Sequence, residues 1–302
     1  MGLDINAIKF LLDSKATGTS FEHTVTLGRQ GLFIEPNALA EILRRVSPRF
    51  TTADAQALLA RGDGFCEPFL EALGATAPAS LDVSPYQSAS IIHDMNEAVP
   101  QHLHAAFSLV IDSGTLEHIF NTPQAIMNCM QMVRPGGHFV CITTANNFMG
   151  HGFYQFSPEL FFRVLSPVNG YAVERMLIYE EYWGDIRFFE VTDPESVGGR
   201  VTLVNRYPTF LLVRARRTAL QPIFARVPQQ SDYQPVWQDF HAGGRAADAG
   251  RIQGIGNGAA RASQRVWRAL RPLVPAGLKQ QLRRYERGPD AFDRRFYKPV
   301  TL

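Results

Sequence analysis

Three aspartates stand at the ends of short apolar stretches in the first half of the chain. Asp82 follows ASL, Asp94 follows ASIIH and Asp112 follows FSLVI. Such stretches predict short buried strands, and an open parallel sheet binds its ligand beyond the carboxyl ends of its strands. A carboxylate in that position accepts hydrogen bonds from hydroxyl or amino groups. The pattern therefore predicts a binding site for a ligand that carries such donors.

A second candidate region is the polar and aromatic segment TTANNFMGHGFYQFSP at 143–158, which follows another apolar stretch. His151, flanked by two glycines, is the candidate general base, because a base must come within hydrogen-bond reach of the proton that it removes. We expect Tyr154 to act with it, and Asn146, Asn147 and Gln155 to hold a polar substrate. The alternative is a tight turn with aromatic packing, since many loops only connect elements.

The elements that must position these residues follow from hydrophobic periodicity. The apolar run at 107–112, a helix at 122–133, the turn RPGG and an apolar run at 138–144 form one βαβ unit. Further strands are predicted at 21–30, 80–84, 89–96, 171–180 and 209–217. Helices are predicted at 38–46, 51–60 and 157–165, and the last begins with Ser157-Pro158, a favourable N-cap and first residue. The aromatic stretch between the last two strands is predicted to be an insertion or a lid.

The run FSLVIDSGTLEHI, followed by MVRPGGHFV, resembles the second half of the class I S-adenosylmethionine-dependent methyltransferases, in which an LEH signature recurs. The resemblance covers most of the first 217 residues. It implies an α/β fold with a Rossmann-like, seven-stranded methyltransferase sheet. In that sheet the strands at 171–180 and 209–217 form the antiparallel finish, with strand seven beside strand five.

The resemblance also implies a cofactor, S-adenosylmethionine, and residues that bind it. Gly28 would allow the cofactor to approach the backbone, Asp82 would bind the ribose hydroxyls and Asp94 the adenine amino group. Asp112, Ser113 and Gly114 would line the sulfonium side. The glycine-rich loop departs from the family pattern, because VTLGRQGLF has Arg29 and Gln30 where small residues are expected. Outside the family, a strand-end aspartate more simply stabilises a turn.

The other histidines and the cysteines do not predict a metal site. His102 and His104 form an HxH pair without a carboxylate cluster at ligand spacing, and solvated loop histidines are commoner. His118 is predicted to be a partly buried structural residue. Cys129 and Cys141 lie in apolar stretches, which is typical of small buried side chains rather than nucleophiles. We therefore expect no metal ion.

Composition predicts a folded chain with an unusual end. Hydrophobic residues make up 45% and charged residues 19% of 302 residues, which suits a globular core. The chain contains no apolar run of bilayer length, and its start predicts no secretory signal. Residues 261–300 hold 11 Lys/Arg against 3 Asp/Glu, while the whole chain carries only +2. We predict a methyltransferase-like domain at 1–220, a flexible linker at 221–260 and a basic helical extension at 261–302.

The basic extension predicts a peripheral contact. It could dock on an anionic membrane surface, bind a partner protein or fold back on the acidic body. No motif predicts recognition of a specific nucleic acid. A cytoplasmic location is expected, with possible peripheral attachment at the inner membrane face.

Two functions follow from the sequence. The first is an enzyme of class EC 2.1.1 that methylates a hydroxyl of a small molecule or glycan, for example in surface polysaccharide biosynthesis. The second is an inactive methyltransferase-fold scaffold in a membrane-associated glycan-assembly complex. The side chain of Arg29 distinguishes them, since it blocks the cofactor if it points inward and permits binding if it points outward.

Overall fold

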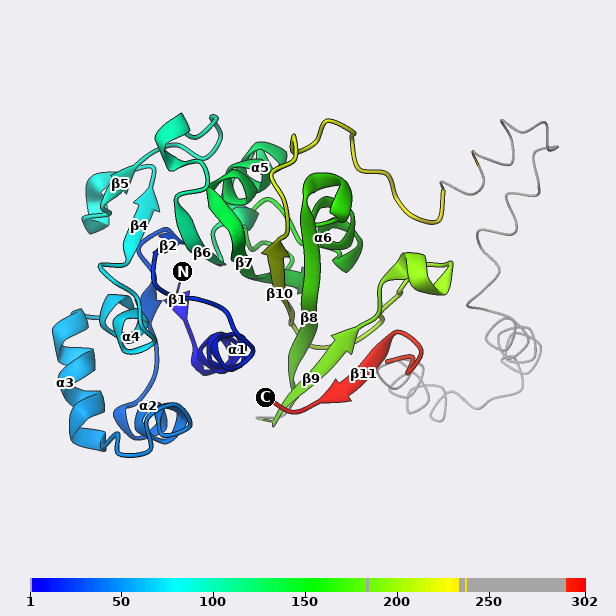
Figure 1. The fold of residues 1–302 in the computed structure, drawn as a ribbon. Helices are drawn as coiled ribbons and strands as arrows, with labels where there is room; N and C mark the ends of the chain where they lie inside the picture. Colours follow the sequence, from blue (N-terminus) through cyan, green and yellow to red (C-terminus); the bar gives the residue numbers. More distant parts are fainter. Residues whose placement is uncertain (1, 183–184, 234–236, 238–291) are drawn as a thin grey trace, which may run out of the picture. The chain divides into compact units, whose positions relative to one another are not determined.

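The computed structural model describes residues 2–182, 185–233, 237 and 292–302 (Figure 1). The chain divides into two compact units. Of the described residues, the first holds 2–182, 185–191, 207–228 and 299–302, and the second holds 192–206, 229–233, 237 and 292–298. All predicted site residues belong to the first unit.

The chain forms a mixed β-sheet with the strand order β11-β9-β8-β10-β7-β6-β2-β4-β5, and every strand except β11 lies wholly in the first unit. The strands are β2 (Thr24–Leu27), β4 (Ala79–Asp82), β5 (Ile91–Ile92), β6 (Phe107–Ser113), β7 (Val133–Asn146), β8 (Tyr171–Tyr182), β9 (Asp185–Val191), β10 (Thr209–Arg217) and β11 (Tyr297–Val300). A separate parallel pair joins β1 (Gly2–Leu3) to β3 (Gly31–Leu32). Every strand predicted from the sequence is present.

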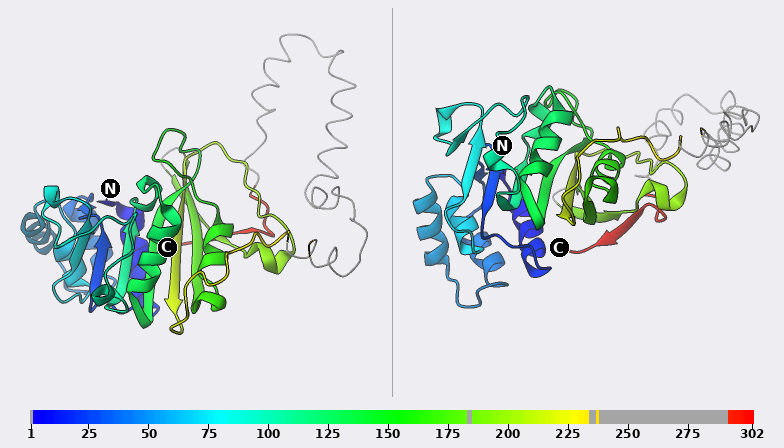
Figure 2. Two further views of the ribbon diagram at one scale, coloured as in Figure 1. Left: turned by 90° about the horizontal axis from the view of Figure 1, so that it is seen from above. Right: turned by 45° about the horizontal axis from the view of Figure 1, so that its top comes forward.

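The helices are α1 (Ile5–Ala16), α2 (Pro36–Leu43), α3 (Thr52–Gly62), α4 (Glu67–Ala72), α5 (Thr122–Met132) and α6 (Pro158–Val164). Two predicted starts are confirmed in detail. Thr51 and Asp54 form a capping box at α3, and the Ser157 side chain accepts a hydrogen bond from the Glu159 amide at α6. In Figures 1 and 2, α2, α3 and α4 lie together on the side where β4 and β5 form the edge of the sheet.

The order of the strands confirms the predicted antiparallel finish. Strands β2, β4, β5, β6 and β7 run parallel, and β10 lies antiparallel between β7 and β8. The sheet has nine strands rather than the predicted seven. One addition is β9, which pairs with β8 inside the segment expected to be an insertion or lid. The other is β11, a strand where a helical extension was predicted, with Pro299 at a sheet edge that tolerates its missing N–H.

The RPGG turn is also different from the prediction. Strand β7 already begins at Val133, and the pairing with β6 slips between Phe107 and Leu109 to accommodate the extra residues. Gly136 has a φ of 80°, and a Cβ on Gly137 would lie 2.8 Å from the Ser108 carbonyl oxygen. The two glycines are therefore needed for an irregularity within a strand rather than for a separate turn.

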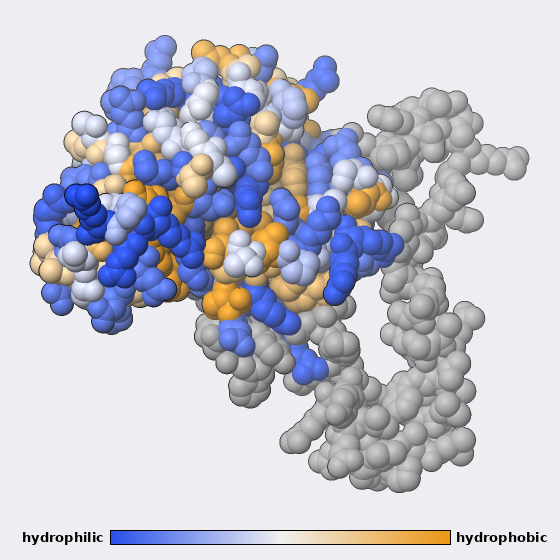
Figure 3. All heavy atoms as spheres, turned by 60° about the horizontal axis from the view of Figure 1, so that its bottom comes forward, coloured by the Kyte–Doolittle hydropathy of each residue, from blue (hydrophilic) through white to orange (hydrophobic). Residues whose placement is uncertain are grey.

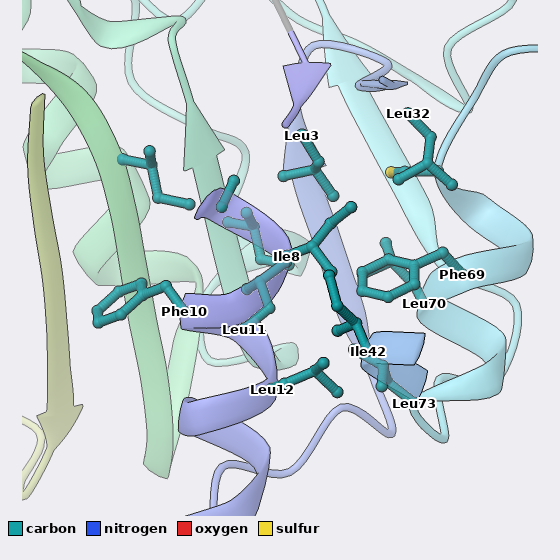
Figure 4. Packing of buried hydrophobic residues seen from close by; sticks show 14 of the residues in the cluster. Leu3, Ile8, Phe10, Leu11, Leu12, Leu32, Ile42, Phe69, Leu70 and Leu73 are labelled. Carbon is teal, nitrogen blue, oxygen red and sulfur yellow. The ribbon is translucent and has the colours of Figure 1, made fainter. Parts of the chain in front are cut away.

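One face of the sheet packs against α1 and the α2–α4 group. Ile8, Leu11 and Leu12 of α1 lie beside Phe69 and Leu70 of α4 in the close view of Figure 4, and all five are buried. The sheet contributes alternate residues to the same cluster, including Leu109, Ile111, Val140 and Ile142. Alternation places the intervening residues on the opposite face.

Helix α5 covers that opposite face. It contacts β6 and β7, and the Tyr171 hydroxyl donates a 2.6 Å hydrogen bond to the Met130 carbonyl. Cys129 on α5 and Cys141 on β7 are buried free thiols, and burial raises the pKa of both well above the usual value. This confirms that these cysteines act as small core residues.

The second unit contains a short polar cluster among its described residues. Arg200 forms a 2.7 Å ion pair with Asp232 and donates a 3.0 Å hydrogen bond to the Tyr233 hydroxyl. The Tyr297 hydroxyl donates to the Val201 carbonyl at 3.0 Å. Residues 238–291, which include most of the predicted linker and basic extension, lie outside the described residues. Their organisation and partners therefore stay predictions.

The described surface is mixed in character. On the face drawn in Figure 3, hydrophobic residues form small groups between hydrophilic ones. None of the helices in the described part of the chain is long and apolar enough to cross a membrane.

Candidate functional site

A cavity of about 250 Å³ opens at the carboxyl ends of β2, β4, β5 and β6. Its lining includes three of the residues predicted to bind a cofactor: Gly28, Asp82 and Asp94. These residues come from three different strand ends, more than fifty positions apart at the extremes. The parallel order of the strands brings them together, because parallel strands present their carboxyl ends at one edge.

Gly28 occupies a position that favours glycine. Its φ is 67°, a left-handed conformation that other residues adopt at a cost. The Gly28 amide donates a 2.7 Å hydrogen bond to the Leu81 carbonyl, and its carbonyl accepts one from the Thr26 hydroxyl at 2.8 Å. The residue thus closes β2 against β4 and leaves the cavity wall without a side chain.

Asp82 and Asp94 each hold one carboxylate oxygen against the backbone. The Ser84 amide donates to Asp82 Oδ1 at 3.0 Å, and the Asn96 amide donates to Asp94 Oδ1 at 2.9 Å. Hydrogen bonds from the Asn96 backbone and side chain lower the pKa of Asp94. Within the described residues, no hydrogen bond reaches the second oxygen of either carboxylate, so both can accept from a ligand.

Asp112, Ser113 and Gly114 are not part of the cavity lining. Asp112 is fully buried and accepts hydrogen bonds from the amides of Thr115 and Leu116 and from the Cys141 thiol. Burial, with the nearby Glu117 carboxylate, raises the pKa of Asp112 to about 8. The Ser113 hydroxyl donates to the Gly2 carbonyl at 3.0 Å. Asp112 thus holds the turn after β6, and the role in cofactor binding predicted for Asp112, Ser113 and Gly114 stays a prediction.

The two large residues of the glycine loop are not part of the cavity lining. Arg29 Nε forms a 2.6 Å ion pair with Glu67 Oε1 on α4, and its guanidinium lies 4.0 Å from the centre of the Phe65 ring. Gln30 is buried and donates to the Leu27 carbonyl and, at 3.4 Å, to the Thr115 hydroxyl. Both side chains therefore brace the loop rather than fill the space beside Gly28.

A cluster of Glu117, His118 and His151 lies beside the cavity. One ligand atom from each residue comes within 4.8 Å of the others. The Glu117 side chain is 1% exposed and that of His151 50%, and His151 Nε2 lies 3.7 Å from Glu117 Oε1. His118 was predicted to be a partly buried structural residue, but it is exposed and lines the cavity. Residues 116–118 form a 3-10 turn ahead of α5, in which Glu117 is buried and His118 is exposed.

The backbone ties the His151 loop to Glu117. The amides of Phe153 and Tyr154 donate to the Glu117 carbonyl at 2.7 and 3.2 Å. Gly152 has a φ of 70°, and a Cβ there would lie 2.7 Å from the same carbonyl oxygen. Gly152, which follows His151, thus permits a close approach of two backbones. The pairing of His151 with Glu117 could not be found from the sequence, because 34 positions separate them.

Several predicted acceptor residues stabilise this loop. The Tyr154 hydroxyl donates to the Phe120 carbonyl at 2.8 Å, so its proton is already engaged. The Asn147 side-chain amide donates to the Tyr207 carbonyl at 2.9 Å, and Gln155 Oε1 accepts from the Phe148 amide at 2.7 Å. Asn146 lies at the end of β7 and is half-buried. The roles predicted for these side chains in binding a substrate stay predictions.

Three exposed apolar side chains that were not among the predicted site residues lie in the segments that carry the cluster. Phe120, Met149 and Phe153 are 73%, 93% and 66% exposed, and the rings of Phe120 and Phe153 meet edge to face at 5.9 Å. The only hint of these apolar side chains in the sequence was the number of aromatic residues in the 148–156 segment. Their exposure, however, is a property of the folded loop.

Comparisons with known proteins give structural matches only. No protein-family model and no curated protein matches the sequence. A methyltransferase dependent on S-adenosylmethionine from Mesorhizobium loti matches at 17% identity over 71% of this chain and 100% of its own, with a TM-score of 0.40. The N-methyltransferase NodS from Bradyrhizobium japonicum, in complex with S-adenosylhomocysteine, matches at 14% identity over 70% and 86%, with a TM-score of 0.36.

A third match is the branched-chain polyamine synthase from Thermus thermophilus, at 12% identity over 75% of this chain and 60% of its own, with a TM-score of 0.35. Scores this low carry no argument about activity. The fold follows from the sheet itself, in which parallel strands end in an antiparallel β10 inserted between β7 and β8, as the resemblance predicted. The protein therefore has the Rossmann-like fold of the class I S-adenosylmethionine-dependent methyltransferases.

Proposed function

We propose that the protein transfers a methyl group from S-adenosylmethionine to a hydroxyl group, as an enzyme of class EC 2.1.1. The observation that carries this proposal is the convergence of Gly28, Asp82 and Asp94 on one cavity. The Asp82 carboxylate suits the two vicinal hydroxyls of a ribose, and the Asp94 carboxylate suits an amino group; both are donors that adenosine offers. Gly28 leaves room beside them because it has no side chain.

The cavity suits the adenosine part of the cofactor. Its volume of about 250 Å³ lies slightly below the usual range for sites that enclose a drug-sized ligand. Val83 and Ile119 line it as apolar residues, which suits the faces of a flat ring. Asp82 would hold the ribose and Asp94 the adenine amino group. When bound, the cofactor supplies an electrophilic methyl group on a sulfonium centre.

The position of Arg29 supports an enzyme over the inactive scaffold. Its ion pair with Glu67 keeps the guanidinium out of the cavity lining. The loop is therefore altered in sequence, but the space beside Gly28 is not filled by the large side chains. No observation in the described residues favours a scaffold.

We assign to His151 the role of the base that removes the proton from the acceptor hydroxyl. Its half-exposed side chain faces solvent, while Nε2 lies 3.7 Å from the buried Glu117 carboxylate. A carboxylate beside an imidazole stabilises the cation that forms when the ring accepts a proton. The Thr143 hydroxyl donates to Glu117 Oε2 at 2.9 Å and fixes that carboxylate in turn. His151 can thus accept a proton from an acceptor hydroxyl that is placed beside the cavity.

The acceptor is proposed to be a small molecule or a glycan. The polar groups of 143–158 support a hydroxylated acceptor, and the exposed Phe120 and Phe153 rings offer apolar faces on which a sugar or another ring can stack. A role in surface polysaccharide biosynthesis belongs to the same proposal.

Calorimetric titration with S-adenosylmethionine and S-adenosylhomocysteine tests the cofactor assignment. We expect micromolar binding by the wild-type chain and its loss in Asp82→Ala, with Asp112→Asn as the control variant that leaves the cavity lining unchanged. Absence of wild-type binding at millimolar ligand would overturn the proposal. Equal binding by wild type and Asp82→Ala would show that the cofactor binds at another site.

A further inference from the structure

We propose that Glu117, His118 and His151 form a binding site for a divalent first-row transition metal ion. One ligand atom from each residue already lies within 4.8 Å of the other two. The sequence predicted no metal ion, because these three residues do not follow a regular ligand spacing. Glu117 and His118 are adjacent, and His151 comes from a different loop, so the ligand set exists only in the folded chain.

The buried carboxylate calls for a positive partner. Glu117 is 1% exposed, and the Thr143 hydroxyl donates only to Oε2. His151 Nε2 lies 3.7 Å from Oε1, which is too far for a hydrogen bond. Fully buried Asp112 lies close enough for the charge of Glu117 to raise its pKa. A divalent cation at Oε1 would compensate a negative charge that the described surroundings leave incompletely neutralised.

The ligands are held in place by their own backbone. The amides of Phe153 and Tyr154 bond to the Glu117 carbonyl, and this ties the His151 loop to the turn that carries Glu117 and His118. The rings of His118 and His151 meet at 5.0 Å between centres, and Phe148 packs against His151 at 5.7 Å. Binding of one ion at about 2.0–2.2 Å would require these side chains to rotate so that their ligand atoms come closer together.

The chemical types of the three ligands indicate which metal ions would bind. Two imidazoles and one carboxylate suit zinc and its first-row neighbours, whereas magnesium and calcium prefer oxygen ligands. Three protein ligands leave at least one coordination position open, which is the arrangement of a catalytic rather than a structural site. Because His118 also lines the cavity, the open position lies next to the proposed cofactor site.

The use of the metal in catalysis rests on the proposed function, whereas metal binding itself does not. An acceptor hydroxyl in the open position would become more acidic through coordination and would release its proton to solvent. In the metal-loaded protein His151 is a ligand, and it is the base only when the metal is absent. The carbon–sulfur bond to the methyl group breaks as the new oxygen–carbon bond forms, so that charge and atoms balance.

The test is a titration of Zn²⁺, and of Co²⁺ as a spectroscopic probe, into the full chain after removal of any affinity tag and of bound metal with a chelator. We expect one ion per chain by calorimetry and visible d–d absorption in the Co²⁺ form. His118→Ala, His151→Ala and Glu117→Gln are each expected to weaken binding by about 10-fold or more. His102→Ala, which removes a histidine outside the cluster, is expected to bind as the wild type does.

Two results would overturn the metal site. One is the absence of stoichiometric binding by the wild-type chain, and the other is equal binding by His118→Ala, His151→Ala and wild type. His118 is exposed, so its replacement tests the site even if Glu117→Gln fails to fold. Titration of S-adenosylmethionine into the same samples separates the two proposals. Metal binding without cofactor binding would reject methyl transfer and keep the metal site, and the reverse result would do the opposite.

Discussion

The ends of β4 and β5 and the end of β6 use the same residue type for different purposes. Asp82 and Asp94 line a cavity and keep one carboxylate oxygen available. Asp112 is fully buried, and its pKa is raised to about 8. An aspartate at a strand end can therefore be a ligand group or a support of the adjacent turn. The number of backbone and side-chain groups packed over it decides between these roles.

The cavity carboxylates and the buried Asp112 therefore contribute to different properties, ligand binding in the first case and stability in the second. The cavity acids would contribute binding energy only when a ligand brings donors to their second oxygens. Asp112 instead organises the turn that leads to Glu117 and His118, and it does so with both oxygens occupied. Substitutions at the two kinds of position should therefore separate binding from stability.

The largest effect is expected for Asp82→Ala. Loss of two hydrogen bonds from ribose hydroxyls to a charged acceptor should raise the dissociation constant for S-adenosylmethionine by about 100-fold. Thermal unfolding should change little, because the side chain of Asp82 is not part of the core. Calorimetry gives the first quantity and circular dichroism the second. A large loss of stability with unchanged affinity would place Asp82 in the same class as Asp112.

A smaller effect on binding is expected for Asp94→Asn. The Asn side-chain oxygen can still accept from the Asn96 amide, but its amino group cannot accept a hydrogen bond from adenine. Affinity for S-adenosylmethionine should fall by about 10-fold, which corresponds to roughly 1.4 kcal/mol. Titration with inosine-type and adenosine-type analogues would check the assignment. A variant that loses the same affinity for both analogues would contradict contact with the amino group.

Asp112→Asn should alter the pH dependence of stability and leave cofactor affinity unchanged. The pKa of Asp112 is raised from 3.8 to about 8, so the folded chain keeps a proton that the unfolded chain has lost between these values. The contribution of Asp112 to stability is therefore present below pH 3.8 and is lost as pH rises towards 8. The variant should remove this loss and gain at least about 1 kcal/mol at pH 9 relative to wild type.

Chemical denaturation of both chains at pH 5, 7 and 9 would measure this effect. Parallel calorimetry with S-adenosylmethionine provides the control for an intact site. Identical pH profiles for the two chains would show that Asp112 is ionised in the folded state, contrary to its buried environment.

The smallest effect is expected for Arg29→Ala. The substitution removes an ion pair with Glu67, whose partners are 27% and 23% exposed, and a contact with the Phe65 ring. Stability should fall by about 1 kcal/mol, while the affinity for S-adenosylmethionine should stay within about 3-fold of wild type. Tighter cofactor binding by the variant would indicate that Arg29 obstructs the site after all.

The sequence by itself determined the succession of elements and the strand-end positions of the acids. Alternation and helical periodicity are local properties, so the strands at 80–84 and 107–112 and the start of α6 at Ser157-Pro158 could be predicted. The antiparallel finish could be predicted only through the resemblance, and the additional strands β9 and β11 could not, because sheet edges are completed by distant partners.

Tertiary structure alone decided which of these residues meet and in what environment. Burial separates Asp112 from Asp82 and Asp94, although all three follow similar apolar runs. Packing turns Arg29 towards Glu67, and a close backbone approach at Gly152 brings His151 to Glu117 and His118. The physical reason is that solvation, and the distance between residues far apart in the chain, are set by the assembled sheet and its loops rather than by neighbouring residues.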